Sequence, residues 1–260
     1  MDITGKIKAK AIQLGFDIVG ITTAEPIEQA QIVYLKDWLK NGYNGQMEYM
    51  SRNFQKRINP AELLKGAKSV ICVSMNYKPP EDIAAGKAGF ANFALYEDYH
   101  PFIKNLLFQL AEFIQNSTDK KIKFKACVDS APVAERALAQ RAGVGFIGKN
   151  HMLINPTLGL QTLLGELITD LPLSPDEPFS QTCRNCDKCI KACPAAALRE
   201  DGIFDANRCI SYLTIEHRGE ISDELREKIS DSKFGCDKCI LACPYNNAAP
   251  ICKNKNFHRR

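Results

Sequence analysis

The stretch CRNCDKCIKACP, residues 183–194, carries four cysteines at gaps of two, two and three residues, and the last one precedes a proline. Three thiolates at two-residue gaps fit three corners of a [4Fe–4S] cube, and the cysteine before the proline ligates the other cube where two are present. A second stretch, CDKCILACP at residues 236–244, repeats this pattern without its first cysteine. Cys209, upstream of that stretch, can supply the missing thiolate. The spacing therefore predicts a duplicated unit that holds two cubane clusters.

The predicted ligation exchanges one cysteine between the two halves of this unit. The first cluster takes Cys183, Cys186, Cys189 and Cys243, and the second takes Cys193, Cys209, Cys236 and Cys239. Two alternatives are a pair of zinc knuckles, which crowds too many thiolates for tetrahedral ions, and clusters with a purely structural role. Of the remaining cysteines, Cys72 and Cys127 are expected to be buried in strands, and Cys252 is expected to be a surface thiol.

The composition is that of an ordinary globular protein. Of 260 residues, 45% are hydrophobic and 25% are charged, which excludes disorder along the whole chain. No apolar run reaches the ~18 residues of a membrane span, and the N-terminus has no secretory signal pattern. We therefore expect a cytoplasmic protein with no membrane association, in which clustered cysteines bind metal rather than form disulfides. The net charge of +4 is too small to indicate a nucleic-acid binder.

A proline-rich stretch, LPLSPDEP at residues 171–178, divides the chain, because three prolines there disfavour both helix and strand. We predict a cofactor- and substrate-binding domain over 1–175, a ferredoxin-like domain over 176–250 and a basic tail over 251–260. A ferredoxin domain alone is far shorter than this chain. The front domain is therefore expected to hold the chemistry that uses the electrons.

Helix and strand patterns alternate in the front domain. Apolar spacing predicts a helix opening at Ile3 and another over residues 102–114. A strand is predicted at residues 16–21, and the apolar run at residues 69–73 predicts a buried strand. Residues 121–128 alternate, with Ile122, Phe124, Ala126 and Val128 facing the core and Lys121, Lys123, Lys125 and Cys127 facing solvent. A helix with Ser130 as its N-cap and Pro132 in its first turn is predicted to end at Gly143. The overall fold class is α+β, with an α/β front domain.

Asp129 follows a predicted strand and precedes a predicted helix, which is a common place for a working side chain. The alternative is a carboxylate that only stabilises the helix start. Residues 143–148, GVGFIG, match the spacing of a dinucleotide-binding loop. We reject that function, because the loop follows a helix instead of joining a strand to a helix. What remains is a glycine-rich loop that can approach a large flat ligand closely.

Taken together, these residues resemble the epoxyqueuosine reductase family, and the likeness covers nearly the whole chain. It is carried by the eight-cysteine spacing and by these segments: RINP at 57–60, AKSVI at 67–71, DYH at 98–100, VDSAP at 128–132, RAGVGFIGKN at 141–150, GELITDLP at 165–172, CISYLTIE at 209–216, FGCDKC at 234–239 and CPYN at 243–246. The resemblance implies cobalamin bound between the two domains and an aspartate that donates a proton, which is Asp129 here. It also suggests residues for the cobalamin and substrate pocket: Arg57, Tyr99, His100, Arg141, Lys149, Asn150 and Ser211.

The implied reaction converts epoxyqueuosine to queuosine in tRNA bearing a GUN anticodon, with electrons passing from an external low-potential donor through two clusters to cobalamin. We expect the enzyme to be a monomer. Longer family members carry a helical-repeat extension that helps to hold tRNA, and this sequence ends at Arg260, which weakens the expectation of tRNA binding. Basic stripes at 120–125 and 253–260 fit either phosphate contacts or ordinary surface. The competing functions are a small-molecule reductase resembling reductive dehalogenases, and an electron carrier without catalysis.

Overall fold

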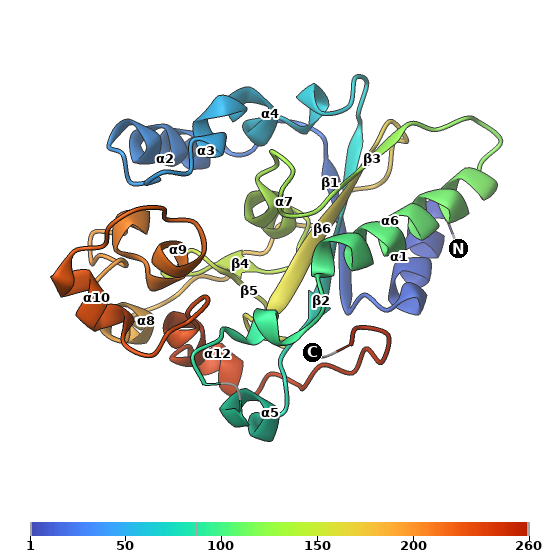
Figure 1. The fold of residues 1–260 in the computed structure, drawn as a ribbon. Helices are drawn as coiled ribbons and strands as arrows, with labels where there is room; N and C mark the ends of the chain where they lie inside the picture. Colours follow the sequence, from blue (N-terminus) through green and yellow to red (C-terminus); the bar gives the residue numbers. More distant parts are fainter. Residues whose placement is uncertain (1, 87, 259–260) are drawn as a thin grey trace.

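A computed structural model describes residues 2–86 and 88–258, and its centre is a four-stranded antiparallel sheet (Figure 1). The strands lie in the order β1-β2-β6-β3, and each neighbouring pair is antiparallel. Their bounds are Ile18–Thr23 for β1, Ser69–Asn76 for β2, Thr162–Thr169 for β6 and Phe124–Cys127 for β3. Because β2 and β6 are the inner strands, both of their edges are paired with neighbouring strands.

Helices cover both faces of the sheet and form a three-layer front domain. Ile71 and Val73 of β2 pack against α1 (Ile3–Leu14) and α6 (Tyr99–Asn116) on one face. Val70 and Cys72 pack against α7 (Glu135–Arg141) on the other. All eight residues of β2 are buried. This two-sided burial explains why β2 reads as a continuous apolar run rather than an alternating one.

The cysteine-rich segment is built from short helices beside the sheet, coloured orange to red in Figure 1. They are α8 (Lys188–Lys191), η3 (Ala206–Arg208), α9 (Ile210–Ile215), α10 (Asp223–Ile229), α11 (Lys238–Leu241) and α12 (Pro244–Asn247). The α8 and α11 helices, one from each cysteine motif, pack against each other. A hairpin of β4 (Phe146–Ile147) and β5 (Leu153–Ile154) lies between this segment and the sheet.

The helical segment between β1 and β2 contacts the cysteine-rich segment and so joins it to the front domain. It contains α2 (Gln29–Lys40), α3 (Tyr49–Arg52), α4 (Phe54–Ile58) and η1 (Pro60–Glu62). The Trp38 indole donates a hydrogen bond to the Phe204 carbonyl at 2.6 Å, and the Tyr212 hydroxyl accepts one from the Gln46 amide at 2.8 Å. Two smaller helices, α5 (Glu81–Gly86) and η2 (Asn92–Leu95), follow β2. Within the described residues, no helix is both long and apolar enough to cross a lipid bilayer.

The C-terminal residues return to the front domain. Phe257 is 3% exposed and stacks on Tyr96 with ring centroids 4.7 Å apart. The Glu97 amide donates to the His258 carbonyl at 3.0 Å. The predicted basic tail over 251–260 is thus anchored at Phe257, and Arg259 and Arg260 lie outside the described residues. Cys252, expected at the surface, is half-buried against the core of the front domain.

Several sequence expectations are confirmed and others are wrong. The opening helix, the strands near 16–21 and 69–73 and the helix near 102–114 are present, and Cys72 and Cys127 are each 1% exposed. Cys127 shares its side of the strand with the exposed lysines, and α7 covers it there. The helix predicted to open at Ser130 begins at Glu135 instead. The preceding residues form a turn in which the Ala131 amide donates to the Val128 carbonyl at 3.4 Å.

Candidate active site and cluster ligands

Asp129 lies in this turn, with its backbone in the left-handed region at φ +43°. Such a conformation is unfavourable for a residue with a Cβ and persists where surrounding contacts impose it. The contact is specific here: the Asp129 amide donates to Oε1 of Glu135 at 2.6 Å. Asp129 therefore does not stand directly before a helix, as the sequence suggested. Glu135, the first residue of α7, holds the turn that presents it.

The carboxylate of Asp129 is held by the first turn of α6. His100 Nε2 lies 3.0 Å from Asp129 Oδ2, and His100 Nδ1 lies 2.7 Å from Asp98 Oδ1. The Tyr99 hydroxyl lies close to Asp129, and burial, followed by the Asp129 charge, raises the pKa of Tyr99. Burial lowers the pKa of His100, but hydrogen bonds to Asp129 and Asp98 outweigh that and raise it above its usual value.

Two further carboxyls lie behind Asp129. Burial, and then the charge of Asp129, raise the pKa of Glu135 to about 7. Glu166 of β6 is 0% exposed and lies between Cys72 and Cys127 across the sheet. Neither of its oxygens has a hydrogen-bond partner among the described residues. Burial, and then the charges of Glu135 and Asp129, raise the pKa of Glu166 well above its usual value.

A cavity of about 270 Å³ opens beside Asp129. One wall is apolar and the opposite edge is polar. The lining residues are Tyr77, Phe93, Tyr99, Asp129, Glu135, Arg136, Met152, Leu153, Leu160, Thr162, Leu163 and Leu164. The volume is close to the lower end of ligand pockets, roughly 300–1,000 Å³. The cavity can thus take one face or edge of a large flat ligand against its apolar wall, with Asp129 and Tyr99 at the polar edge.

The structure brings the eight motif cysteines into two groups, and all eleven cysteines are free thiols. Burial, and then the nearby thiols of Cys209, Cys236 and Cys193, raise the pKa of Cys239. In the other group, burial raises the pKa of Cys243, with the thiols of Cys183, Cys189 and Cys186 acting in the same direction. The two groups have the same members as the two ligand sets that the spacing predicts. Four thiolates are the donor set of a [4Fe–4S] cube, and each group supplies four, so the residue types present fit such clusters.

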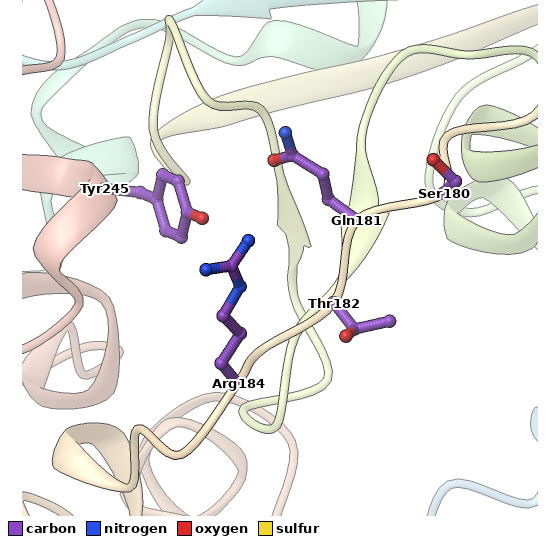
Figure 2. A pocket seen from close by; sticks show the side chains of 5 residues that line it. All are labelled: Ser180, Gln181, Thr182, Arg184 and Tyr245. Carbon is purple, nitrogen blue, oxygen red and sulfur yellow. The ribbon is translucent and has the colours of Figure 1, made fainter.

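The group that contains Cys239 adjoins the cavity. Burial raises the pKa of Tyr77, a residue of the cavity wall, and the charges of Asp237 and Cys239 raise it further. The group that contains Cys243 adjoins a different, polar pocket of about 560 Å³. Figure 2 shows its lining residues, Ser180, Gln181, Thr182, Arg184 and Tyr245, with the Arg184 guanidinium directed toward the Tyr245 ring.

The comparisons with known proteins agree with this arrangement. A family model described as "4Fe-4S double cluster binding domain" matches residues 182–246. Another, described as "Epoxyqueuosine reductase QueG, DUF1730", matches residues 57–130. The epoxyqueuosine reductase of Vibrio cholerae is 41% identical over 264 residues, which cover 99% of this chain and 71% of the relative. The chain belongs to the epoxyqueuosine reductase family. It is accordingly an oxidoreductase with a double [4Fe–4S] cluster domain.

Solved structures place the fold in the same family. An epoxyqueuosine reductase with an epoxyqueuosine-modified tRNA-Tyr stem loop has a TM-score of 0.86 at 32% identity, over 95% of this chain and 66% of that one. The Bacillus subtilis enzyme, solved with an aspartate-bearing catalytic loop swung out of its active site, has a TM-score of 0.85 at 32% identity with the same coverage. A catabolic reductive dehalogenase, with a TM-score of 0.58 and 18% identity over 92% of this chain and 31% of its own, shares the fold alone.

Three of the pocket residues suggested by the resemblance lie beside Asp129. Tyr99 and His100 contact it directly. Burial lowers the pKa of Arg57, against the charges of Tyr49, Glu135 and Asp129 nearby. Its Nη2 donates to the Tyr49 carbonyl at 3.3 Å, while its Nε is buried with no partner among the described residues. Arg57 therefore lies near Asp129 without lining the cavity.

Arg141 lies elsewhere and makes other contacts. Its guanidinium donates to Thr22 Oγ1 at 2.8 Å, and to the carbonyls of Pro26, Thr23 and Glu25 at 2.7, 3.0 and 2.9 Å. It does not line the cavity. The side chain instead ties the end of α7 to the segment that leaves β1.

The other three suggested residues lie near the cysteines. Asn150 is 6% exposed, and its Nδ2 lies 3.4 Å from the Cys239 carbonyl. Burial raises the pKa of Cys209, while hydrogen bonds from the Tyr212 and Ser211 amides lower it. Ser211 thus faces a cluster thiol through its backbone. Lys149 is exposed and lies near Asp187, whose pKa is lowered first by its hydrogen bond to Lys191 and also by the charge of Lys149.

Sequence reasoning missed Glu135, Glu166 and Tyr77. For Glu166 a signal was present, because a carboxylate inside the apolar stretch at residues 163–168 is unusual unless it is neutral or paired. For Glu135 and Tyr77 the deciding fact is spatial: each meets Asp129 or Cys239 only through the fold.

Proposed function

We propose that this chain reduces epoxyqueuosine to queuosine in tRNA, and that Asp129 is its proton donor. The observation that carries the proposal is the position of Asp129. Its carboxylate is held by His100 and Tyr99 at the edge of a cavity whose wall adjoins the Cys239 thiol group. Family membership and the double-cluster domain support the same reaction.

We assign the cluster ligands by the two thiol groups. Cys183, Cys186, Cys189 and Cys243 hold one [4Fe–4S] cluster, and Cys193, Cys209, Cys236 and Cys239 hold the other. The short helices α8 and α11 each carry a cysteine of one group and are followed by a cysteine of the other. Since α8 and α11 pack together, electrons need to cross only a short distance between the two sites.

The cavity beside Asp129 is the proposed site of cobalamin. Its apolar wall, from Met152 to Leu164, suits the face of a corrin ring, and Tyr99 and Arg136 supply polar groups to the lining. Cobalamin supplies a strongly reducing, nucleophilic cobalt centre that can accept single electrons. The surrounding residues bind and orient the ring and exclude water from the reacting face of the substrate.

Asp129 supplies a proton to the oxygen that leaves the epoxide. Conversion of an epoxide to an alkene takes up two electrons and two protons and releases water. His100, whose pKa is raised by Asp129 and Asp98, can pass a proton to Asp129 across their 3.0 Å contact. The swung-out aspartate loop of the Bacillus subtilis enzyme is consistent with Asp129 lying on a loop that moves.

We further propose that tRNA binds on the side of β3. Lys120, Lys121, Lys123 and Lys125 are exposed and lie on or beside the strand that leads to Asp129, where they can contact phosphates. The structure of a relative with a tRNA stem loop supports this substrate class. We expect a cytoplasmic monomer that receives its electrons from an external low-potential donor. A simple electron carrier would leave the cavity beside Asp129 without a role.

The deciding experiment is anaerobic reconstitution of the purified chain with iron, sulfide and cobalamin, followed by an assay on RNA that contains epoxyqueuosine. We expect the reconstituted enzyme to form queuosine over repeated turnovers. Nucleoside mass spectrometry measures the amount formed. A reconstituted protein that holds iron and cobalamin but leaves epoxyqueuosine intact would contradict the proposed substrate.

A further inference from the structure

We propose that Arg136, Tyr34 and His151 form a subsite for one nucleotide at the edge of the cavity beside Asp129. Arg136 binds the phosphodiester of this nucleotide, and the Tyr34 ring stacks on its base. The inference deepens the proposed function and rests on it. The nucleotide is either a neighbour of epoxyqueuosine in the RNA or the nucleotide portion of cobalamin, and binding measurements separate these two sources.

Arg136 is the one cation among the described residues that line the cavity. The residue is exposed, and its Nη1 donates a hydrogen bond to the His151 carbonyl. Among the residues that the structure describes, Arg136 forms no ion pair, although Asp129 and Glu135 line the same cavity. The N–H groups of a guanidinium lie in a planar fork that matches two phosphate oxygens. Arg136 therefore has donors left for an anion that enters the cavity.

His151 links Arg136 to a row of aromatic side chains. It lies in the turn between β4 and β5, where its amide donates to the Gly148 carbonyl at 2.9 Å and its backbone is in the left-handed region at φ +59°. Its ring stacks on Tyr34 of α2, with centroids 5.4 Å apart and 27° between the planes. The His151 ring also contacts Phe204, at 5.8 Å between centroids. Three segments far apart in the sequence thus bring aromatic rings together beside Arg136.

Part of this aromatic row is open to solvent. Tyr34 is 38% exposed, while His151 packs against its ring and its hydroxyl accepts a hydrogen bond from the Phe204 amide at 3.3 Å. Asp201 lies near Tyr34 and is paired with Arg199 at 2.7 Å, so it presents little free negative charge to an incoming anion. An exposed tyrosine ring held by such contacts is a stacking platform for a flat aromatic group.

A nucleotide matches both features at once. It joins a flat aromatic base to an anionic phosphodiester, and proteins hold single strands by stacking bases on aromatic side chains and placing cations along the phosphates. A carboxylate alone would pair with Arg136 and leave Tyr34 without a partner, and an uncharged aromatic ligand would do the reverse. The proposed contents of the cavity are cobalamin and a modified nucleoside of RNA. Each of them brings a nucleotide unit to this place.

The RNA source is tested with the protein carrying its clusters and cobalamin, under anaerobic conditions. The probe is a fluorescent anticodon stem loop that contains epoxyqueuosine, and binding is measured by anisotropy. Tyr34→Leu removes the ring, Tyr34→Phe keeps it, and Arg136→Gln removes the charge. Val33→Ala, at an exposed neighbour on α2, and Arg226→Gln, at an exposed arginine on α10, are the matched controls.

If a nucleotide of the RNA occupies the subsite, Tyr34→Leu and Arg136→Gln should each weaken RNA binding by about fivefold or more. Tyr34→Phe and both controls should bind like the wild type. An abasic residue next to epoxyqueuosine, on the side that contacts Tyr34, should remove the difference between Tyr34→Leu and the wild type, because the base that stacks is then missing.

The cofactor source is tested by absorbance titration of the cluster-loaded protein with cobalamin and with cobinamide, which has the corrin ring but no nucleotide. If the nucleotide of cobalamin occupies the subsite, Tyr34→Leu and Arg136→Gln should weaken cobalamin binding by about fivefold or more and leave cobinamide binding unchanged. Thermal melting checks that each variant is folded. Arg136→Lys, which keeps the charge but lacks the planar fork, replaces Arg136→Gln if the latter does not fold.

Either of these two patterns supports the subsite and identifies its source. Wild-type affinity of the folded variants for both RNA and cobalamin would overturn the inference. Equal losses for cobalamin and cobinamide, or equal losses in Tyr34→Phe or in the controls, would also overturn it. Wild-type protein that binds neither cobalamin nor the epoxyqueuosine stem loop would instead contradict the proposed function.

Discussion

At the scale of single residues, the position of Asp129 depends on contacts from two helices. Glu135 of α7 holds its backbone, while His100 and Tyr99 of α6 hold its carboxylate. The left-handed backbone at φ +43° is unfavourable in isolation, so these contacts are what keep the side chain at the cavity. Asp129 is thus placed by tertiary contacts, and its chemistry depends on the same neighbours.

Asp129→Asn should abolish most of the epoxide reduction. The amide has nearly the shape of the carboxyl but cannot donate a proton as an acid, and general acids contribute roughly 10²–10⁴-fold to rate. Turnover measured on epoxyqueuosine-containing RNA should fall by about this factor, while cobalamin and iron contents stay at the wild-type level. Full turnover in the variant would show that the proton comes from another group.

Glu135→Gln should flatten the dependence of stability on pH. The pKa of Glu135 is raised from 4.5 to about 7 in the folded protein, so its ionisation opposes folding. The stability it contributes is complete below about pH 4.5 and is lost as pH rises through about 7. A pKa increase of this size changes the free energy of unfolding by at most on the order of 3 kcal/mol. Urea unfolding at several pH values should show a smaller decline in the variant, and an unchanged decline would contradict the assignment.

At the scale of secondary-structure elements, α7 positions the site and is itself anchored by Arg141. Four hydrogen bonds join this side chain to the end of β1 and to the segment that follows it. The resemblance suggested a role for Arg141 in the cobalamin or substrate pocket. The contacts instead indicate an architectural role, which can be separated from binding by experiment.

Arg141→Met should lower the free energy of unfolding by about 1–3 kcal/mol, because it removes four hydrogen bonds, two of them part-buried. The cobalamin dissociation constant of the folded fraction should remain within about twofold of the wild type, as measured by absorbance titration. A large loss of cobalamin affinity without loss of stability would show that Arg141 takes part in binding instead.

At the scale of the whole molecule, each proposed cluster draws ligands from both cysteine motifs. Cys243→Ala should therefore remove the cluster of the first motif, and Cys193→Ala the cluster of the second. Iron should fall from about eight to about four per chain in each variant, with different surviving signals in electron paramagnetic resonance. Loss of the cluster nearest in sequence, instead of the opposite one, would contradict the exchanged ligation.

Much of this protein follows from local patterns. Cysteine spacing predicts two cubane clusters, apolar runs predict β1 and β2, and helical periodicity predicts α1 and α6. These features depend on neighbours within a few residues, or on covalent spacing, so the chain alone is sufficient to indicate them. The resemblance to epoxyqueuosine reductases can also be recognised from the sequence.

The tertiary structure decided the rest. The α7 helix begins only at Glu135, because the preceding residues form the turn that holds Asp129. Cys127 is buried on the side of its strand that the alternating pattern assigned to solvent. The tertiary structure also gathered Asp129, His100 and Glu135, and set Glu166 among apolar strands. These facts depend on contacts between residues far apart in the chain. Charge, burial and strain at such points are properties of the packed molecule, and no local pattern encodes them.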